Sequence, residues 1–122
     1  MSLAELVADT SPARQAIVDA LAQVGGLSPS PSTPAPIVAG SAWPARYERT
    51  WLNACASQDG WYVFVALPNG DLEATIDVAD PLIDDVAAVL WPIGQLVRVE
   101  PWRFPVEPGQ QSVPVLRFQL MT

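Results

Sequence analysis

The sequence contains no histidine and no lysine, and its single cysteine is Cys55. Histidine is the commonest general base in enzymes, so the first candidate for acid–base catalysis is missing. Cys55 has neither a histidine partner nor a positively charged environment that would activate a thiolate, and we interpret it as a buried or half-buried structural thiol. One cysteine excludes an internal disulfide, and structural zinc needs about four Cys or His ligands. We therefore expect no enzyme activity, no catalytic residue, no bound metal and no cofactor.

Two other catalytic signatures are also missing. Ser41 in "AGSAW" lacks the G-x-S-x-G elbow that presents a hydrolase nucleophile. The seven glycines are scattered singly or in pairs at expected turns, and they form no phosphate-binding loop.

Positive charge is scarce, with six basic residues, all arginine, against 13 acidic ones and a net charge of −7. Nucleic-acid binding needs a basic patch that displaces counterions from phosphates, and this balance argues against one. It also disfavours attachment to a membrane surface. The N-terminus shows no basic region followed by an apolar run, and no stretch approaches the ~20 apolar residues of a membrane span. We expect a soluble protein made in a cytoplasm.

Apolar residues make up 50% of the 122 positions, which predicts one compact domain over residues 1–122. Proline is abundant, and the stretch "LSPSPSTPAP" contains four prolines. Such a stretch forms a semi-rigid connector or a surface loop. Because only about 25 residues precede it, we interpret residues 25–36 as a loop inside the single domain.

Two segments predict helices. Residues 11–26 begin with Ser-Pro and end with Gly-Gly, and a capping-box pattern at Ser2 and Glu5 precedes them. Residues 71–94 form the second helical segment, in which Pro81 either kinks the helix or starts its main part. Both segments have apolar residues at helical spacing, namely Ile17, Ala20, Leu21 and Val24 in the first and Ile76, Ala79, Ile83, Val86 and Leu90 in the second.

Three strands are expected between the helices. The first is the short "PIVAG", and the next two lie within "RTWLNACASQDGWYVFVALPNG", where Asp59-Gly60 is a tight-turn signal. The segment "WPARYERTW" also fits helical spacing, so a helix there stays open. "WYVFVAL" is apolar on both faces and should be a central strand.

The chain ends on "QLVRVEP" and "VPVLRFQLM", which predict two further strands. We expect Val97 and Val99 to face the core in one, and Leu116, Phe118 and Leu120 in the other. The prolines at 101, 105, 108 and 114 are typical of edge strands, first strand positions and bulges.

This order of elements predicts an α+β fold. We expect a mostly antiparallel sheet of four to five strands with two helices packed on one face.

The strongest charge feature is an acidic stripe on the second predicted helix. It consists of Glu73, Asp77, Asp80 and Asp84, which are spaced four, three and four residues apart. One interpretation is a solvated helix face, and another is the wall of a pore through which a polyanion slides without adhering. A cation site is a third, although one straight stripe does not make carboxylates converge.

The five tryptophans are the second excess. We assign Trp61 and Trp91 to the core. The other three lie beside arginines in proline-rich segments, which is the composition of interface centres, although side chains covering loop edges would give the same pattern. The candidate interface residues are Trp43, Arg46, Tyr47, Arg49, Trp51, Trp102 and Arg103.

The order and pattern of these pieces resemble a known family. The pieces are "SPARQAIVDALAQVGG", a proline-rich loop into "PIVAG", the strand "GWYVFVALP", the helix "LIDDVAAVLWPIG" and the closing "LVRVEPWRFPVEPGQQSVPVLRFQL". They look like tail terminator proteins of long-tailed, siphovirus-type bacteriophages, the lambda-like tail terminator family. The resemblance covers nearly the whole chain and contains no catalytic or metal motif.

The resemblance implies a structural virion protein located at the head–tail junction. Six identical subunits would form a ring on the finished tail tube, stop its polymerisation and join it to the head through neck proteins. DNA would pass through a central channel without specific binding. The expected partners are therefore other copies of the chain, the tail tube protein and a head-completion protein, and the acidic stripe would border the channel. The "WPARYERTW" segment and the 101–112 loop are candidates for contacts with the tube or the neck.

Two alternatives stay open. The nearer is a head-completion or neck connector protein of the same kind of virion. The more distant is an enzyme or metal-binding module that uses the carboxylates of residues 71–85.

Overall fold

The computed structural model describes residues 12–68, 72–106, 108 and 112–122, and for 72–78 it describes the backbone alone. Within these residues the chain forms two helices and five strands. In chain order they are α2 (Pro12–Leu21), β1 (Ser28–Pro29), β2 (Ser41–Asn53), β3 (Ala56–Ala66), α3 (Leu72–Leu90), β4 (Gln95–Phe104) and β5 (Val113–Met121).

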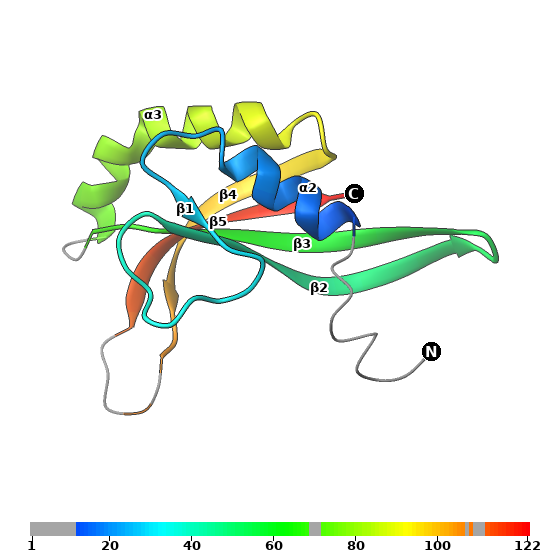
Figure 1. Cartoon of the computed structure of the whole chain (residues 1–122), viewed down its shortest axis with the longest axis horizontal. Coiled ribbons are helices and arrows are strands. Elements are labelled where there is room, and N and C mark those ends of the chain that lie inside the picture. Colours follow the sequence, from blue (N-terminus) through cyan, green and yellow to red (C-terminus); the bar gives the residue numbers. More distant parts are fainter. Residues whose placement is uncertain (1–11, 69–71, 107, 109–111) are drawn as a thin grey trace.

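The strands form one sheet in the order β1-β2-β3-β5-β4. The short β1 runs parallel to β2, and the three other pairings are antiparallel. Both helices lie on the same side of this sheet (Figure 1). The predicted α+β fold, with a mostly antiparallel sheet and two helices on one face, is therefore confirmed.

The main core lies between the helices and the sheet. Helix α2 contributes Ile17 and Leu21, and α3 contributes Val86 and Leu90, all fully buried and all at the helical spacings that the sequence predicted. Trp61 is buried in the same core, as expected. The sheet residues that share this core are Ala42, Trp61, Val63, Val65, Leu67, Leu116, Phe118 and Leu120.

The opposite face of the sheet has a second, smaller cluster made largely of aromatic rings. Trp43 and Phe64 stack with their ring centroids 5.4 Å apart, and Phe104 meets Trp43 edge-on at 5.2 Å. Ile37, from the loop before β2, packs against this cluster. Strand β3 is thus apolar on both faces, as its sequence predicted, and it lies between β2 and β5.

The first strand does not lie where the sequence placed it. Residues 37–40 of "PIVAG" are irregular, and the strand is instead Ser28–Pro29 inside the proline-rich stretch. Its position is set by backbone bonds, because the Ser28 N–H donates to the Gly40 carbonyl and the Ser30 N–H donates to the Ala42 carbonyl. The segment "WPARYERTW" belongs to β2 and is not a helix.

The predicted turn at Asp59-Gly60 is wrong, because both residues lie inside β3. The turn is at Ala54–Cys55, where the Asn53 side-chain oxygen accepts a hydrogen bond from the Cys55 N–H at 2.8 Å. This local bond is an Asx turn, which competes with the Asp-Gly signal. The strands of the hairpin are consequently longer than the sequence indicated, 13 and 11 residues.

Two predicted core residues are exposed. Trp91 is 64% exposed, because α3 ends at Leu90 and this leucine takes the buried position. Val97 is 47% exposed, because a register shift between Leu96 and Arg98 lets Leu96 and Val99 both pack on the core.

Two details of the helix predictions have different outcomes. Pro81 lies inside one helix, so it does not begin a separate one. The predicted capping box at Ser2 and Glu5 lies outside the described residues.

Gly60 has a packing role. A Cβ at this position would lie 2.5 Å from Cζ of Tyr47, so the absent side chain leaves room for the tyrosine ring on the sheet. The ring stacks on Tyr62 at 4.4 Å, and its hydroxyl accepts a hydrogen bond from the Gln119 side chain at 2.7 Å.

We predict that Gly60→Ala displaces the Tyr47 ring and lowers the free energy of unfolding by about 1–3 kcal/mol, the range of overpacking substitutions. Urea denaturation would measure the change. Gly25→Ala is the matched control, since a Cβ there meets no atom within 4 Å; we expect a change within about 0.5 kcal/mol. Equal stability of Gly60→Ala and Gly25→Ala would contradict the packing role.

Candidate interaction surface

The β2–β3 hairpin projects beyond the rest of the sheet (Figure 1). Strand β1 pairs only with the first two residues of β2, and β5 pairs with β3 from Gly60 to Ala66. The last link to β5 is a pair of backbone bonds between Asp59 and Thr122. Residues 50–58, which we call the hairpin arm, therefore pair only with one another among the described parts of the chain.

The tip of the hairpin arm is apolar and exposed. Trp51 and Leu52 are 64% and 65% exposed, and they lie next to the turn that contains Cys55. Cys55 is also exposed, so the prediction of a buried or half-buried thiol is wrong. A large aromatic and an aliphatic side chain that are both exposed on a protruding element are typical of residues that a partner covers.

An ion-pair cluster marks the base of the arm. The Arg49 guanidinium donates to both oxygens of Asp59, at 2.7 and 3.1 Å, and Arg46 lies 3.7 Å from the same carboxylate. The hydrogen bonds from Arg49 are the main reason that the pKa of Asp59 lies below its usual range. Partial burial of the carboxylate raises the pKa, and the positive charges of Arg49 and Arg46 lower it further. This cross-strand pairing fixes the register where the arm leaves the sheet.

A row of stacked side chains crosses the sheet on the face opposite the helices. The Arg117 guanidinium lies between two rings, 4.5 Å from the centre of Tyr62 and 4.4 Å from that of Trp102. Tyr47 extends the row on one side, and Glu100 holds the guanidinium through a hydrogen bond of 2.6 Å. Residues of β2, β3, β5 and β4 thus form one stacked row across the four long strands.

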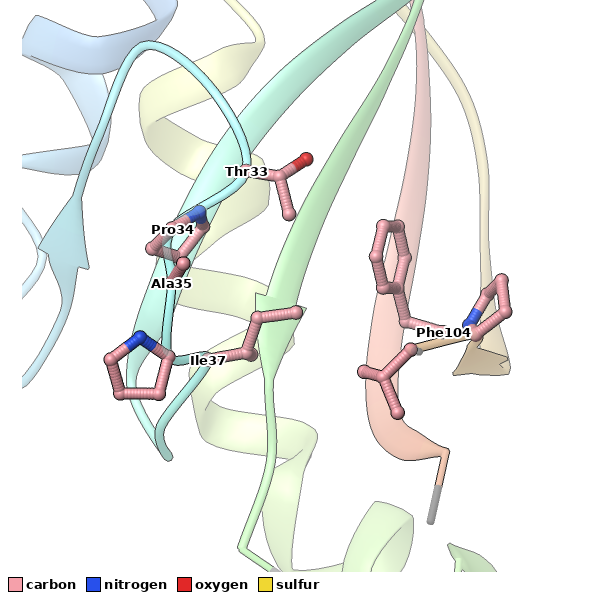
Figure 2. Close-up of a pocket in the computed structure, with 8 residues that line it drawn as sticks. Thr33, Pro34, Ala35, Ile37 and Phe104 are labelled. Carbon is pink, nitrogen blue, oxygen red and sulfur yellow. The ribbon is translucent and has the colours of Figure 1, made fainter. Parts of the chain in front are cut away.

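A cavity of about 460 Å³ lies near one end of this face. Figure 2 shows Thr33, Pro34, Ala35 and Ile37 of the proline-rich loop on one side and Phe104 of β4 on the other. We call this cavity the loop pocket. Among the described residues its lining consists of Thr33, Pro34, Ala35, Pro36, Ile37, Phe104, Pro105 and Val106, none of which is charged.

The loop pocket has an ordered wall because the loop is fastened to α2. The Arg14 guanidinium donates to the carbonyls of Pro31 and Pro44, at 2.6 and 3.1 Å. Ile37 and Phe104 connect the pocket to the buried aromatic cluster below it.

The candidate interface residues do not form one patch. Trp43 is fully buried, so its assignment to an interface is wrong; the ring covers Phe64 and is itself covered by Phe104. Trp51 lies on the hairpin arm, whereas Trp102 lies on the edge strand β4 and belongs to the stacked row. The remaining candidates lie on two separate strands, Arg46, Tyr47 and Arg49 on β2 and Arg103 on β4.

Sequence reasoning missed Leu52, Tyr62, Phe104 and Arg117. The alternation of "WYVFVA" already indicated a second apolar face of β3, which is the signal that could have found Tyr62. Phe104 and Arg117 depend on which strands are neighbours, and a single sequence does not contain that information.

The acidic stripe lies on α3, since Glu73, Asp77, Asp80 and Asp84 all fall within this one helix. Asp80 and Asp84 are exposed, together with Asp85. The side chains of Glu73 and Asp77 lie outside the described part of the chain. In that part no three Cys, His, Asp or Glu residues gather as a metal site would require.

Two further findings bear on function. No helix in the described ranges is both long enough and apolar enough to cross a membrane. Comparison with models of protein families found no match, and a search of curated protein sequences found none either.

We predict that Asp59→Asn destabilises the protein at neutral pH and that the difference disappears in acid. The folded pKa of Asp59 is lower than its ordinary value of 3.8, so its stabilising effect is complete above that value and is lost as the pH falls through the folded pKa. Urea unfolding at pH 7 and at several pH values that descend well below 3.8 would measure it. Asp84→Asn, which removes one exposed charge from α3, is the control; an equal loss in both variants at pH 7 would contradict the role of the ion pair.

Proposed function

We propose that this protein is a structural component of a bacteriophage virion that forms a ring on the end of the tail tube. In that role it ends tube polymerisation and joins the tail to the head through a neck protein, with a central channel for DNA. The ring is proposed to hold six subunits, as the resemblance to tail terminators implies.

The observation that carries this proposal is the hairpin arm with Trp51 and Leu52 at its tip. A single copy leaves this apolar pair uncovered, and a ring of identical subunits supplies a partner for it. Cyclic rings are built from heterologous contacts, in which one surface of a subunit meets a different surface of the next. An element that projects from one end of the molecule suits such a contact.

The edges of the sheet fit the same role. Strand β4 is an edge strand with Pro101 within it, and β1 at the other edge contains Pro29. Proline at an edge hinders uncontrolled addition of further strands. This favours closed assemblies made through side chains over open-ended fibres made through strand pairing.

The acidic residues of α3 are proposed to border the channel. Asp80 and Asp84 are exposed on a helix that lies on one face of the sheet, in a chain of net charge −7. Like charges along a channel would keep DNA from adhering during ejection.

A head-completion or neck connector protein is the second candidate, because it would use the same kind of ring and arm. The partner separates the two, since a connector would bind the portal side and would not stop tube growth. A carboxylate-based metal site is a more distant candidate, for which calorimetry with divalent cations is the direct test.

We predict that the purified protein, added to the tail tube protein of the same phage, stops tube elongation and leaves a cap on tube ends. Turbidity would follow elongation, and negative-stain images would show caps or free rings. Tubes that grow equally well with and without the protein would contradict the terminator role, and binding to a portal-side protein in that case would favour the connector.

We further predict that Asp77→Asn, Asp80→Asn and Asp84→Asn, combined in one variant, make DNA ejection from assembled particles slower and more dependent on salt. Neutral helix faces would let DNA approach the wall more closely. Asp19→Asn, on an exposed carboxylate of α2, is the control for lost charge. Normal ejection by the triple variant at low and high salt would remove the channel from the proposal.

A further inference from the structure

The hairpin arm and the loop pocket lie at opposite ends of the molecule. In Figure 1 the arm forms one extreme of the long axis, and the proline-rich loop and the end of β4 lie toward the other. The arm therefore cannot reach the pocket of its own chain, and any hairpin tip that enters a loop pocket comes from another molecule.

We propose that Trp51 and Leu52 of one subunit insert into the loop pocket of the next copy of this chain. This contact would be the heterologous joint of the assembly, with the tip as the projecting part and the walls formed by residues 33–37 and 104–106 as the recess. The proposal rests on the proposed function for the closure of the ring, and it adds which surfaces meet.

The chemistry of the two surfaces matches. The tip presents an aromatic and an aliphatic side chain, and the described lining of the pocket is made of apolar and proline residues together with Thr33. A cavity of about 460 Å³ is within the size range that accommodates drug-sized molecules, so it has room for a tryptophan side chain. Proline rings and aromatic side chains form suitable walls for an inserted ring, as in proline-rich recognition.

Charge favours the same contact. Two copies that each have a net charge of −7 repel one another over most approaches. The hairpin from residue 46 to 59 contains two arginines and two acidic residues, Glu48 and Asp59, so its net charge is zero. The described residues that line the loop pocket carry no charge either. Two neutral surfaces on an acidic chain let copies meet end to end where like-charge repulsion is least.

The size of the contact explains how such an assembly would be controlled. Two side chains in a pocket bury much less than the ~800 Å² per partner of a stable interface, so one joint by itself is weak. In a closed ring every subunit takes part in two joints, and a tube end would hold subunits at high local concentration. Assembly would then depend on the template.

The native Cys55 provides a direct test, because it lies in the turn at the tip of the arm and is exposed. In Thr33→Cys, a short bifunctional maleimide should join Cys55 of one copy to the new cysteine of the next and give a ladder of covalent multimers. Thr33 is exposed at the pocket wall, so the substitution should not disturb the core.

Two control variants define the result. Ala88→Cys places a second thiol on the exposed side of α3, and it should give dimers through Cys55 but no ladder. Thr33→Cys combined with Cys55→Ser should lose the ladder. A Thr33→Cys sample that gives no more multimers than Ala88→Cys, with and without tail tube protein, overturns the inference.

A second measurement tests the energetic role of the tip. Trp51→Ala, added to Thr33→Cys, should lower the yield of the covalent ladder about tenfold or more in the presence of tail tube protein, as expected for truncation of a central interface tryptophan. Trp91→Ala is the matched control, since both tryptophans are 64% exposed, and it should leave the ladder yield unchanged. Equal effects of the two substitutions would contradict the proposal.

The outcomes separate this inference from the proposed function. Ladder formation by Thr33→Cys together with unhindered tube growth would support the joint and refute the terminator. Capped tubes whose subunits give no ladder would support the terminator and refute this joint.

Discussion

Strand β3 has to be covered on both of its faces, and the rest of the structure depends on that requirement. Trp61, Val63 and Val65 point toward α2 and α3, while Tyr62 and Phe64 point the other way. Helices α2 and α3 cover the first of these faces. The second is covered by rings from β2 and β4 and by Ile37 of the proline-rich loop. The loop is thereby a structural part of the sheet's second face, and the pocket between it and β4 follows from this arrangement.

The same sheet produces the projecting arm. Strands β2 and β3 are longer than the strands that flank them, and their pairs with β1 and β5 end before the hairpin does. A two-stranded ribbon without a third strand or a helix has few ways to bury its side chains. Trp51 and Leu52 are left in solvent for that reason, and the ion pairs of Arg49 and Arg46 with Asp59 hold the ribbon at its base.

Much of the fold could be predicted from the sequence, and the errors have local causes. The periodicity of apolar residues correctly predicted both helices and the burial of β3 on both faces, because positions that are buried at a fixed spacing are occupied by apolar residues at that spacing. The turn was misplaced because Asp59-Gly60 is a strong turn signal, yet Gly60 serves to admit the Tyr47 ring and Asp59 serves to bind Arg49. Trp43 was predicted at an interface and is buried, whereas Trp91 was predicted in the core and is exposed. A tryptophan near a proline can face either side, and only the register of β2 with β3 buries Trp43. Of the candidate interface, the sequence pointed to Trp51 through composition but could not place it on a projecting tip.

By itself the sequence determined the fold class, the acidic stripe on one helix and the absence of histidine and lysine, because each of these follows from residue types and their spacing along the chain. The tertiary structure alone decided that the apolar tip and the loop pocket lie at opposite ends of one molecule. Residues 33–37 and 104–106 form one cavity although about 70 positions separate them, since Ile37 and Phe104 pack on the same aromatic cluster beneath the sheet. The contact between these two segments depends on strand order and long-range packing, which no local sequence pattern predicts.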